Sequence, residues 1–406
     1  MNSGYKGNVL VITYWSYRDA LIQTYTLPYV RIIRRNISSG SRLFLVTLEH
    51  SWPVSPEDRK SLEAEGIDWI PFRYYPFGFR GMTSWITRIL GLVRTIRKHK
   101  IAVLHAWCTP AGGVGYILSM LTGRRLILDS FEPHAEAMVE NGTWKEGGIP
   151  FRILFWLEKK QAHRATAVIS ATEGMREYAF LKYGAKFSYF VVKPACVNLN
   201  HFSTNQTDTE TRSALGLDGM VVCVYAGKFG DMYLDQEVFD FFAACVRQFG
   251  ERFRVLLLTN QNRDDIDRWI DRAGLDRHIV LNAFVPHHQI PRYLRVADFA
   301  ITPVKPVPSK RYCTPIKNGE YWAMGLPVVI PRDISDDSDI ILKHQIGAVL
   351  TDLSSQAYDA AAKTIDALLK EPGLNARIRD VAIQYRNYEI AENIYRDIYG
   401  QQTLDK

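Results

Sequence analysis

Residues 309–331, SKRYCTPIKNGEYWAMGLPVVIP, contain the clearest structural signal in the chain. Thr314 is suited to the N-cap of a helix, Pro315 to its first turn and Gly325 to the position just after its end. The pattern therefore predicts a helix over residues 315–324, followed by a short buried strand. A loop, a capped helix and a buried strand in this order are typical of an α/β sheet.

The start of the predicted helix is suited to bind phosphate. The first N–H groups of a helix have no partner within it, and here they belong to Ile316 through Asn318. Lys317 adds a positive charge at the same place, which makes this a candidate anion site. Glu320 lies one turn deeper on the same face, where its carboxylate can accept hydrogen bonds from two ribose hydroxyls. An ordinary helix-to-strand joint with a surface Lys–Glu pair is the alternative that this motif alone leaves open.

A longer match gives the nucleotide interpretation its weight. Residues 314–329, TPIKNGEYWAMGLPVV, resemble the Ser-Pro-x-Lys-x-x-Glu-Tyr-x-Ala-x-Gly-x-Pro-Val-Val signature of retaining GT-B glycosyltransferases, often called glycosyl transferases group one. The resemblance implies two Rossmann-like, doubly wound α/β domains that face each other across a cleft. It also implies a nucleotide-sugar donor and retention of the anomeric configuration. In this interpretation Ile316, Lys317 and Asn318 bind the nucleotide and Glu320 holds the ribose.

Residues near this motif extend the predicted donor site. Lys228 follows the apolar run Val221–Tyr225 and a glycine, and it resembles the position from which family members reach the diphosphate. Many members have a second basic residue a few positions later; here Lys310, Arg311 or Lys317 could replace it. Tyr312 stands where many members carry an acid that positions the sugar, so the donor sugar stays open. Because Lys228 and Lys317 supply positive charge, we expect no metal and no cofactor besides the donor.

A second candidate region lies upstream. Residues 129–136, DSFEPHAE, follow a predicted strand and resemble the region that lines the acceptor side in this family. His134 could contact the donor sugar or phosphate, and we predict it as a catalytic residue together with Lys228 and Glu320. A purely structural histidine is the alternative. His105 also matches a family position, but its place inside a strand favours a role in the core.

Length and pattern predict two domains. A chain of 406 residues is long for a single core. Apolar strands alternate with helices in each half, and the polar stretch that begins at Asn198 separates the two series. We expect an acceptor-binding Rossmann-like domain over residues 1–197 and a nucleotide-sugar-binding one over residues 198–387. The resemblance implies that a C-terminal helix over residues 388–406 packs back on the first domain.

Charge is distributed unequally along the chain. Residues 1–200 hold 26 Lys and Arg against 15 Asp and Glu, a net charge of +11, while the remainder is at −4. This favours an anionic partner, and the absence of a nucleic-acid motif argues against DNA or RNA. Between Arg73 and Lys100 a basic, amphipathic stretch could dock on an anionic membrane surface. The alternative is that its apolar stripe packs on the sheet.

The five cysteines lack the spacing of a zinc site, which fits a reducing cytoplasm. We therefore expect a cytoplasmic protein, with a peripheral position at the inner face of the cell membrane as a further expectation.

These inferences predict a hexosyltransferase that moves a sugar from a nucleotide-sugar to a hydroxyl of a glycan or lipid-linked acceptor, in polysaccharide biosynthesis. The cationic pocket would stabilise the negative charge that develops on the departing diphosphate. Two other functions stay open. A GT-B sugar-nucleotide epimerase would share the fold, but only the region of His134 could serve its elimination chemistry. A non-catalytic nucleotide-sugar-binding protein is compatible with Tyr312 in place of an acid.

Overall fold

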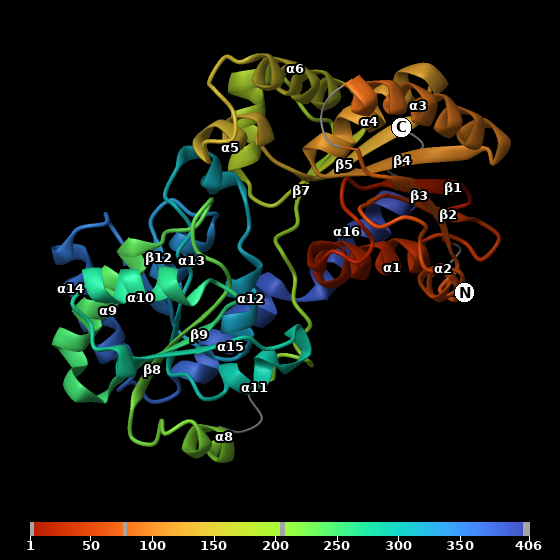
Figure 1. Ribbon diagram of the computed structural model, residues 1–406. Helices are drawn as coiled ribbons and strands as arrows, with labels where there is room; N and C mark the ends of the chain where they lie inside the picture. Colours follow the sequence, from red (N-terminus) through yellow and green to blue (C-terminus); the bar gives the residue numbers. More distant parts are fainter. Residues whose placement is uncertain (1–3, 76–78, 204–207, 401–406) are drawn as a thin grey trace. The chain divides into compact units, whose positions relative to one another are not determined.

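The computed structural model of the protein describes residues 4–75, 79–203 and 208–400. These residues form two compact units, which Figure 1 shows. Unit 1 contains the chain up to Lys193 and again from Glu389, and unit 2 contains Pro194–Tyr388. Four parts of the regions predicted above lie outside the described residues: residues 1–3 of the first domain, 76–78 of the basic stretch between Arg73 and Lys100, 204–207 of the linker and 401–406 of the C-terminal helix.

Unit 1 is built on a parallel sheet with the strand order β3-β2-β1-β4-β5-β6-β7. Its strands are largely buried apolar runs, as expected for a sheet that is covered by helices on both faces. Helices α3, α4 and α6 cover one face, and α1, α2 and α16 cover the other (Figure 1). The strands are β1 (Asn8–Ile12), β2 (Leu43–Glu49), β3 (Ile67–Arg73), β4 (Ile101–Trp107), β5 (Arg125–Phe131), β6 (Ala167–Ser170) and β7 (Phe190–Val192). The helices are α1 (Leu27–Asn36), α2 (Pro56–Ala64), α3 (Phe79–Lys98), α4 (Thr109–Thr122), α5 (His134–Glu140), α6 (Ile149–Arg164), α7 (Gly174–Tyr178) and α16 (Tyr388–Tyr399).

Unit 2 repeats this plan with the strand order β10-β9-β8-β11-β12-β13, again all parallel. The strands are β8 (Val221–Ala226), β9 (Phe253–Leu258), β10 (Val280–Ala283), β11 (Phe299–Ile301), β12 (Val328–Pro331) and β13 (Gly347–Leu350). The helices are α8 (Thr209–Ala214), α9 (Gln236–Phe249), α10 (Arg263–Arg272), α11 (Ile290–Leu294), α12 (Ile316–Ala323), α13 (Asp337–His344), α14 (Ser355–Leu368) and α15 (Leu374–Arg386). The prediction of two doubly wound, Rossmann-like sheets is therefore confirmed.

The strand orders locate the places where ligands are expected. In each sheet the order reverses once, between β1 and β4 in unit 1 and between β8 and β11 in unit 2. Ligands of open α/β sheets bind beyond the carboxyl ends of the strands at such a switch point. In unit 2 this is where β8 leads into the turn with Lys228 and where β11 leads into the loop before α12.

A buried polar cluster holds α16 within unit 1. Asp129 of β5 accepts a hydrogen bond from the Tyr395 hydroxyl of α16 at 2.6 Å. The same carboxylate lies 3.2 Å from the Lys193 ammonium and 3.1 Å from Nε2 of His105. His105 is also 2.8 Å from the Tyr399 hydroxyl, which confirms the expectation that it belongs to the core. Burial acts to raise the pKa of Asp129, but Lys193 and His105 outweigh it and hold that pKa below its ordinary value.

Candidate active site

Helix α12 begins one residue later than the sequence predicts, and Pro315 rather than Thr314 is its N-cap. The hydroxyl of Thr314 is engaged elsewhere, because it accepts hydrogen bonds from the Ala195 N–H at 3.1 Å and from Arg386 at 2.6 Å. The helix ends at Ala323, one residue before the predicted end, and Met324 is its C-cap. The predicted place of Gly325 just after the helix is confirmed: its φ of +71° is a left-handed conformation that glycine adopts without strain.

Two N–H groups at the start of α12 are available to an anion. Those of Ile316 and Lys317 have no hydrogen-bond partner among the described residues. The N–H of Asn318, in contrast, donates to the Pro315 carbonyl at 3.3 Å. The free donors and the positive end of the helix dipole therefore coincide with the Lys317 side chain.

A buried polar network fixes α12 in place. The side chain of Asn318 accepts a hydrogen bond from Thr302, just after β11, at 2.5 Å and donates to Asp337 of α13 at 2.6 Å. Asp337 in turn pairs with Arg386 of α15, which also bonds to Thr314. We predicted Asn318 as a nucleotide-binding residue. Its side chain is turned into the interior, where it positions the helix start that carries the free donors.

Lys317 and Lys228 lie together at the switch point of unit 2. The stem of Lys317 passes so close to Gly227 that a Cβ built there would lie 2.7 Å from its Cε. The Lys317 ammonium lies 5.3 Å from the centre of the Tyr233 ring, an attractive cation–π arrangement. Lys228 follows Gly227 directly and is exposed, with its ammonium 3.0 Å from Asp231. One of the two cations is thus in contact with an aromatic ring, and the other is paired with an exposed carboxylate.

The turn that carries Lys228 is tied to β8 and α12. The Tyr225 hydroxyl donates to the Lys228 carbonyl at 2.6 Å, and the Ala226 N–H donates to the Tyr321 hydroxyl of α12 at 3.0 Å. Burial raises the pKa of both tyrosines, so their hydroxyls stay protonated at neutral pH. These contacts hold the two cationic segments in fixed relation to each other.

Glu320 lies one turn beyond Lys317, and its side chain is 12% exposed. A histidine that the sequence analysis did not single out contacts it: Nε2 of His287 is 3.4 Å from Oε1 of Glu320. Hydrogen bonding to Glu320 raises the pKa of His287. The ring of His201 stacks on His287 at 6.2 Å, and burial lowers its pKa. Among the described residues, the second oxygen of Glu320 has no protein partner that would compete with a ribose hydroxyl.

Sequence reasoning missed three residues of this site, namely Tyr225, Tyr233 and His287. A signal for His287 was present, because it comes four residues after the last residue of β10, at the ligand-binding edge of the sheet. Tyr233 also follows a strand, but nothing in its spacing indicates that its ring would lie beside Lys317.

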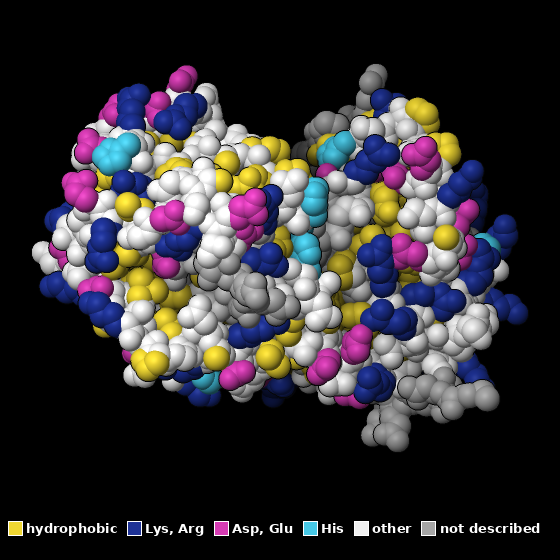
Figure 2. Space-filling view, turned by 90° about the horizontal axis from the view of Figure 1, so that it is seen from below, with side chains coloured by type: hydrophobic (Ala, Val, Ile, Leu, Met, Phe, Trp, Pro, Cys, Tyr) yellow, Lys and Arg dark blue, Asp and Glu magenta, His cyan; other side chains and the backbone are white. Residues whose placement is uncertain are grey.

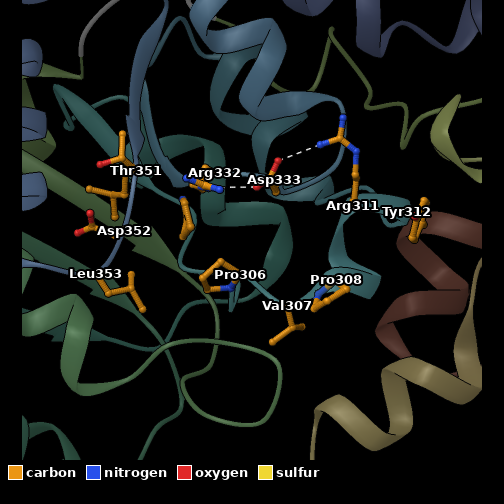
Figure 3. Close-up of a pocket in the computed structure, with 12 residues that line it drawn as sticks. Pro306, Val307, Pro308, Arg311, Tyr312, Arg332, Asp333, Thr351, Asp352 and Leu353 are labelled. Carbon is orange, nitrogen blue, oxygen red and sulfur yellow. Dashed lines mark hydrogen bonds and ion pairs between the residues drawn. The ribbon is translucent and has the colours of Figure 1, made fainter.

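A cavity of about 440 Å³ lies beyond the carboxyl ends of β12 and β13 (Figure 3). Arg311 and Arg332 reach the same carboxylate, that of Asp333, at 2.9 and 3.1 Å. Because the two cations share this carboxylate, and because neither Lys228 nor Lys317 is among the residues that line the cavity, we do not assign the donor phosphates to it. Tyr312 lines this cavity, and Lys310 is buried in the adjoining turn.

His134, the remaining predicted site residue, belongs to unit 1. It is the first residue of α5, beyond the carboxyl end of β5, and its Nδ1 is 3.4 Å from Oε1 of Glu132. Its side chain is 25% exposed and accessible to a ligand. Lys228 and Glu320 belong to unit 2, so a catalytic role shared with them stays a prediction.

The described residues contain neither a metal-binding cluster nor a helix that could span a membrane. Within residues 4–75, 79–203 and 208–400, no three His, Cys, Asp or Glu side chains are grouped so that they could hold a metal ion. Nor does any helix in that part of the chain have the length and apolar character needed to cross a membrane.

Comparison with known families agrees with this geometry. Residues 22–195 match the family model described as Glycosyl transferase 4-like domain, and residues 221–371 match the one described as Glycosyl transferases group 1. Among curated proteins, alpha-D-kanosaminyltransferase of Streptomyces kanamyceticus is 20% identical over 308 residues, which cover 75% of this chain and 76% of that protein.

Solved structures show the same fold. HepE of Anabaena in complex with UDP has a TM-score of 0.73 at 16% identity, covering 96% of this chain and 99% of that one. Sucrose-phosphate synthase of Thermosynechococcus elongatus has a TM-score of 0.72 at 14% identity, covering 99% and 100%. The two parallel sheets and these structures define a GT-B protein. With the two family matches, the chain belongs to the glycosyltransferases of this fold, and unit 2 carries the group 1 domain.

Proposed function

We propose that the protein transfers a hexose from a nucleoside-diphosphate sugar to a hydroxyl group, with retention at the anomeric carbon. The observation that carries this proposal is the meeting of Lys228, Lys317 and the free N–H groups of α12 at the switch point, with Glu320 one turn deeper. HepE of Anabaena was solved with UDP and with UDP-glucose, which supports UDP as the first nucleotide to test.

The proposed chemistry follows from where charge develops. When the bond between the anomeric carbon and the diphosphate oxygen breaks, negative charge collects on the leaving diphosphate. Lys317, Lys228 and the N-terminus of α12 would stabilise that charge, so the proposed reaction needs no metal ion. Glu320 would accept hydrogen bonds from the ribose hydroxyls. In unit 1 we assign the acceptor to the carboxyl edge of the sheet near His134.

We further propose a glycan or lipid-linked intermediate of polysaccharide biosynthesis as the acceptor, at the inner face of the cell membrane. The net charge of +11 over residues 1–200 supports an acceptor or a surface that is anionic.

Calorimetry with UDP, GDP and ADP tests the nucleotide site. Lys317→Met and Glu320→Gln should each weaken binding of the preferred nucleotide by about 10- to 100-fold, because each removes a hydrogen bond that involves a charged group. Lys343→Met is the matched control, since Lys343 is an exposed lysine of the same unit on α13. Unchanged affinity in Lys317→Met and Glu320→Gln would contradict the proposed site.

Incubation with a panel of labelled nucleotide-sugars tests the reaction itself. Transfer to a lipid-linked or glycan acceptor, with a product of the same anomeric configuration by NMR, is the expected result. Conversion of the sugar without transfer would indicate an epimerase, and binding without turnover a non-catalytic protein. Activity that EDTA abolishes would contradict the metal-independent mechanism.

A further inference from the structure

Helices α3, α4 and α6 lie side by side on one face of the sheet of unit 1, with α4 in contact with both of the others (Figure 1). Because all three pack on the same sheet, their outer sides point in the same direction. On α6 that outer side is apolar. Ile149, Ile153 and Trp156 are 74, 51 and 52% exposed, and their spacing of four and three residues places them in one stripe along the helix.

The two neighbouring helices also expose apolar side chains. Met120 and Leu121 of α4 are 59 and 51% exposed, and Ile86 and Leu90 of α3 are 63 and 53% exposed. Single exposed apolar side chains are ordinary on protein surfaces, whereas several on three adjacent helices of one face indicate an interaction site.

The amphipathic stretch predicted around α3 is divided between two roles. Val93 and Ile96, toward the end of the helix, are buried against the rest of unit 1, as the core interpretation predicts. Ile86 and Leu90 instead face solvent. The apolar side chains of α3 therefore serve both the core and the surface that α3 shares with α4 and α6.

The charged groups on this surface are all basic. The sequences of α3 and α4 contain no acid, and the one acid of α6, Glu158, is fully buried and bonded to the Ala135 N–H and the Tyr183 hydroxyl. Seven exposed cations of α3 and α6 have no carboxylate partner among the described residues. They are Arg94, Arg97 and Lys98 on α3 and Arg152, Lys159, Lys160 and Arg164 on α6.

The other face of unit 1 has a different character. There Lys and Arg side chains are interspersed with Asp and Glu (Figure 2). Arg31 of α1 pairs with Glu65 at 2.5 Å, and Arg42 pairs with Asp68 at 2.6 Å. The combination of uncompensated positive charge with exposed apolar side chains is therefore a property of the α3–α4–α6 surface and not of unit 1 as a whole.

We propose that the α3–α4–α6 surface binds the surface of a bilayer that contains anionic lipids. Its apolar side chains would enter the boundary between headgroups and acyl chains, while the surrounding Arg and Lys side chains bind lipid phosphates. Trp156, whose ring lies 5.7 Å from the Lys160 ammonium, has the amphipathic character that suits this interface. Nothing in the binding requires that sugar transfer occur, so it can be tested apart from the proposed function.

Co-sedimentation of the full chain with vesicles tests the proposal. The protein should bind vesicles of phosphatidylcholine mixed with phosphatidylglycerol, more weakly at high salt, and should not bind phosphatidylcholine alone. The triple variant Arg152→Glu, Lys159→Glu, Lys160→Glu should bind at least about 100-fold more weakly, because each basic residue near an anionic surface contributes about a factor of five.

A matched triple variant controls for net charge. Lys60→Glu, Lys343→Glu, Lys363→Glu changes the net charge equally at exposed lysines outside the α3–α4–α6 surface, and it should bind the anionic vesicles almost as well as the unmodified protein. Equal losses in the two triple variants would overturn the proposal, because they would indicate binding through overall charge alone.

The apolar contribution is tested at constant charge. Ile153→Ser with Trp156→Ser should weaken vesicle binding by at least about tenfold, whereas Leu342→Ser with Ile383→Ser, at exposed positions of unit 2, should not. UDP affinity and circular dichroism should stay unchanged in all variants, which separates this result from loss of the nucleotide site or of the fold. Absence of binding to anionic vesicles would overturn the proposal. Self-association that is detected by light scattering and abolished by Ile153→Ser with Trp156→Ser would also overturn the proposal, because it would assign the surface to a second copy of the chain.

Discussion

Glu320 has two oxygens, and in the described structure one of them is in contact with His287. The charged groups around this histidine are Glu320 and the neighbouring His201, with His288 and Arg295 further out. Because Glu320 raises its pKa, His287 binds a proton more tightly in the folded than in the unfolded protein. The stability that this pair contributes is fully present below the ordinary histidine pKa of about 6.5 and is lost as pH rises through the folded value.

Substitution of Glu320 tests this pair. In Glu320→Gln the pKa of His287, followed by NMR of its ring protons, should fall below its value in the unmodified protein. The difference in free energy of unfolding between the two proteins should shrink as pH rises from 5.5 to 8.5, an interval chosen to include the ordinary histidine pKa of about 6.5. Glu63→Gln, an exposed carboxylate of unit 1, is the control and should leave the titration of His287 unchanged. An identical His287 titration in Glu320→Gln would disprove the contact.

Single residues were predictable where the deciding interactions are local. The place of Gly325 just after the helix follows from a backbone conformation that glycine adopts without strain, and the sequence therefore predicts it correctly. Thr314 was predicted as the N-cap and is not, because Arg386, 72 positions away in the chain, takes its hydroxyl. The contact of His287 with Glu320 likewise joins α12 to a turn that is distant in the chain. Local patterns contain no information about such partners.

At the scale of elements, the attachment of α16 depends on one buried carboxylate. Asp129→Asn would leave the fully buried Lys193 ammonium without its counter-ion, and we expect the free energy of unfolding to fall by about 3–5 kcal/mol. Because the pKa of Asp129 is lowered in the fold, its contribution is present at neutral pH and is lost as pH falls from about 4 through that lowered value. Urea denaturation measures both effects.

Glu132→Gln is the control for this substitution. Its carboxylate follows the same strand but is partly exposed, and loss of its contact with His134 should cost less than about 1 kcal/mol. Hydrogen exchange of the α16 amides should accelerate in Asp129→Asn and not in Glu132→Gln, because Tyr395 loses its charged acceptor. A loss of stability below about 1 kcal/mol in Asp129→Asn would show that the cluster does not hold the helix.

The strands were the most predictable elements. Runs such as Leu43–Glu49 and Val221–Ala226 are nearly continuous in apolar side chains, which is the pattern of parallel strands buried on both faces. The position of α16 was not predictable from its own residues. It depends on contacts with Asp129 and His105, more than 250 residues earlier in the chain, and was expected only from the family resemblance.

At the scale of the whole molecule, the residues that we propose bind the nucleotide, Lys228, Lys317 and Glu320, all belong to unit 2. A nucleoside diphosphate should therefore stabilise unit 2 and leave unit 1 unaffected. At 100 times its Kd the ligand should add about 2.7 kcal/mol to the stability of the unit that binds it.

Hydrogen exchange should slow in α12 and in the turn after β8, with no change in α1. At the same ligand concentration Lys317→Met should show a smaller effect, while Lys343→Met should behave as the unmodified protein. Equal protection of both units would be inconsistent with this assignment.

The two-sheet organisation was predictable because alternating strands and helices leave few other architectures. The difference in net charge between the two halves was also visible in composition, but the surface that carries unpaired positive charge was not. Only the folded arrangement shows that α6, which the sequence analysis did not single out for surface binding, exposes apolar side chains as α3 does.

The assignment of Glu389 onward to unit 1 has a consequence for how the chain is made. Unit 1 begins to emerge from the ribosome first, yet Tyr395 and Tyr399 are translated only after the whole of unit 2. Until then Lys193 and the rings of Tyr29 and Trp107, which lie 3.8 and 4.6 Å from its ammonium, lack the helix that covers them. The nascent first half must therefore stay incomplete, and dependent on protection from aggregation, until translation has almost finished.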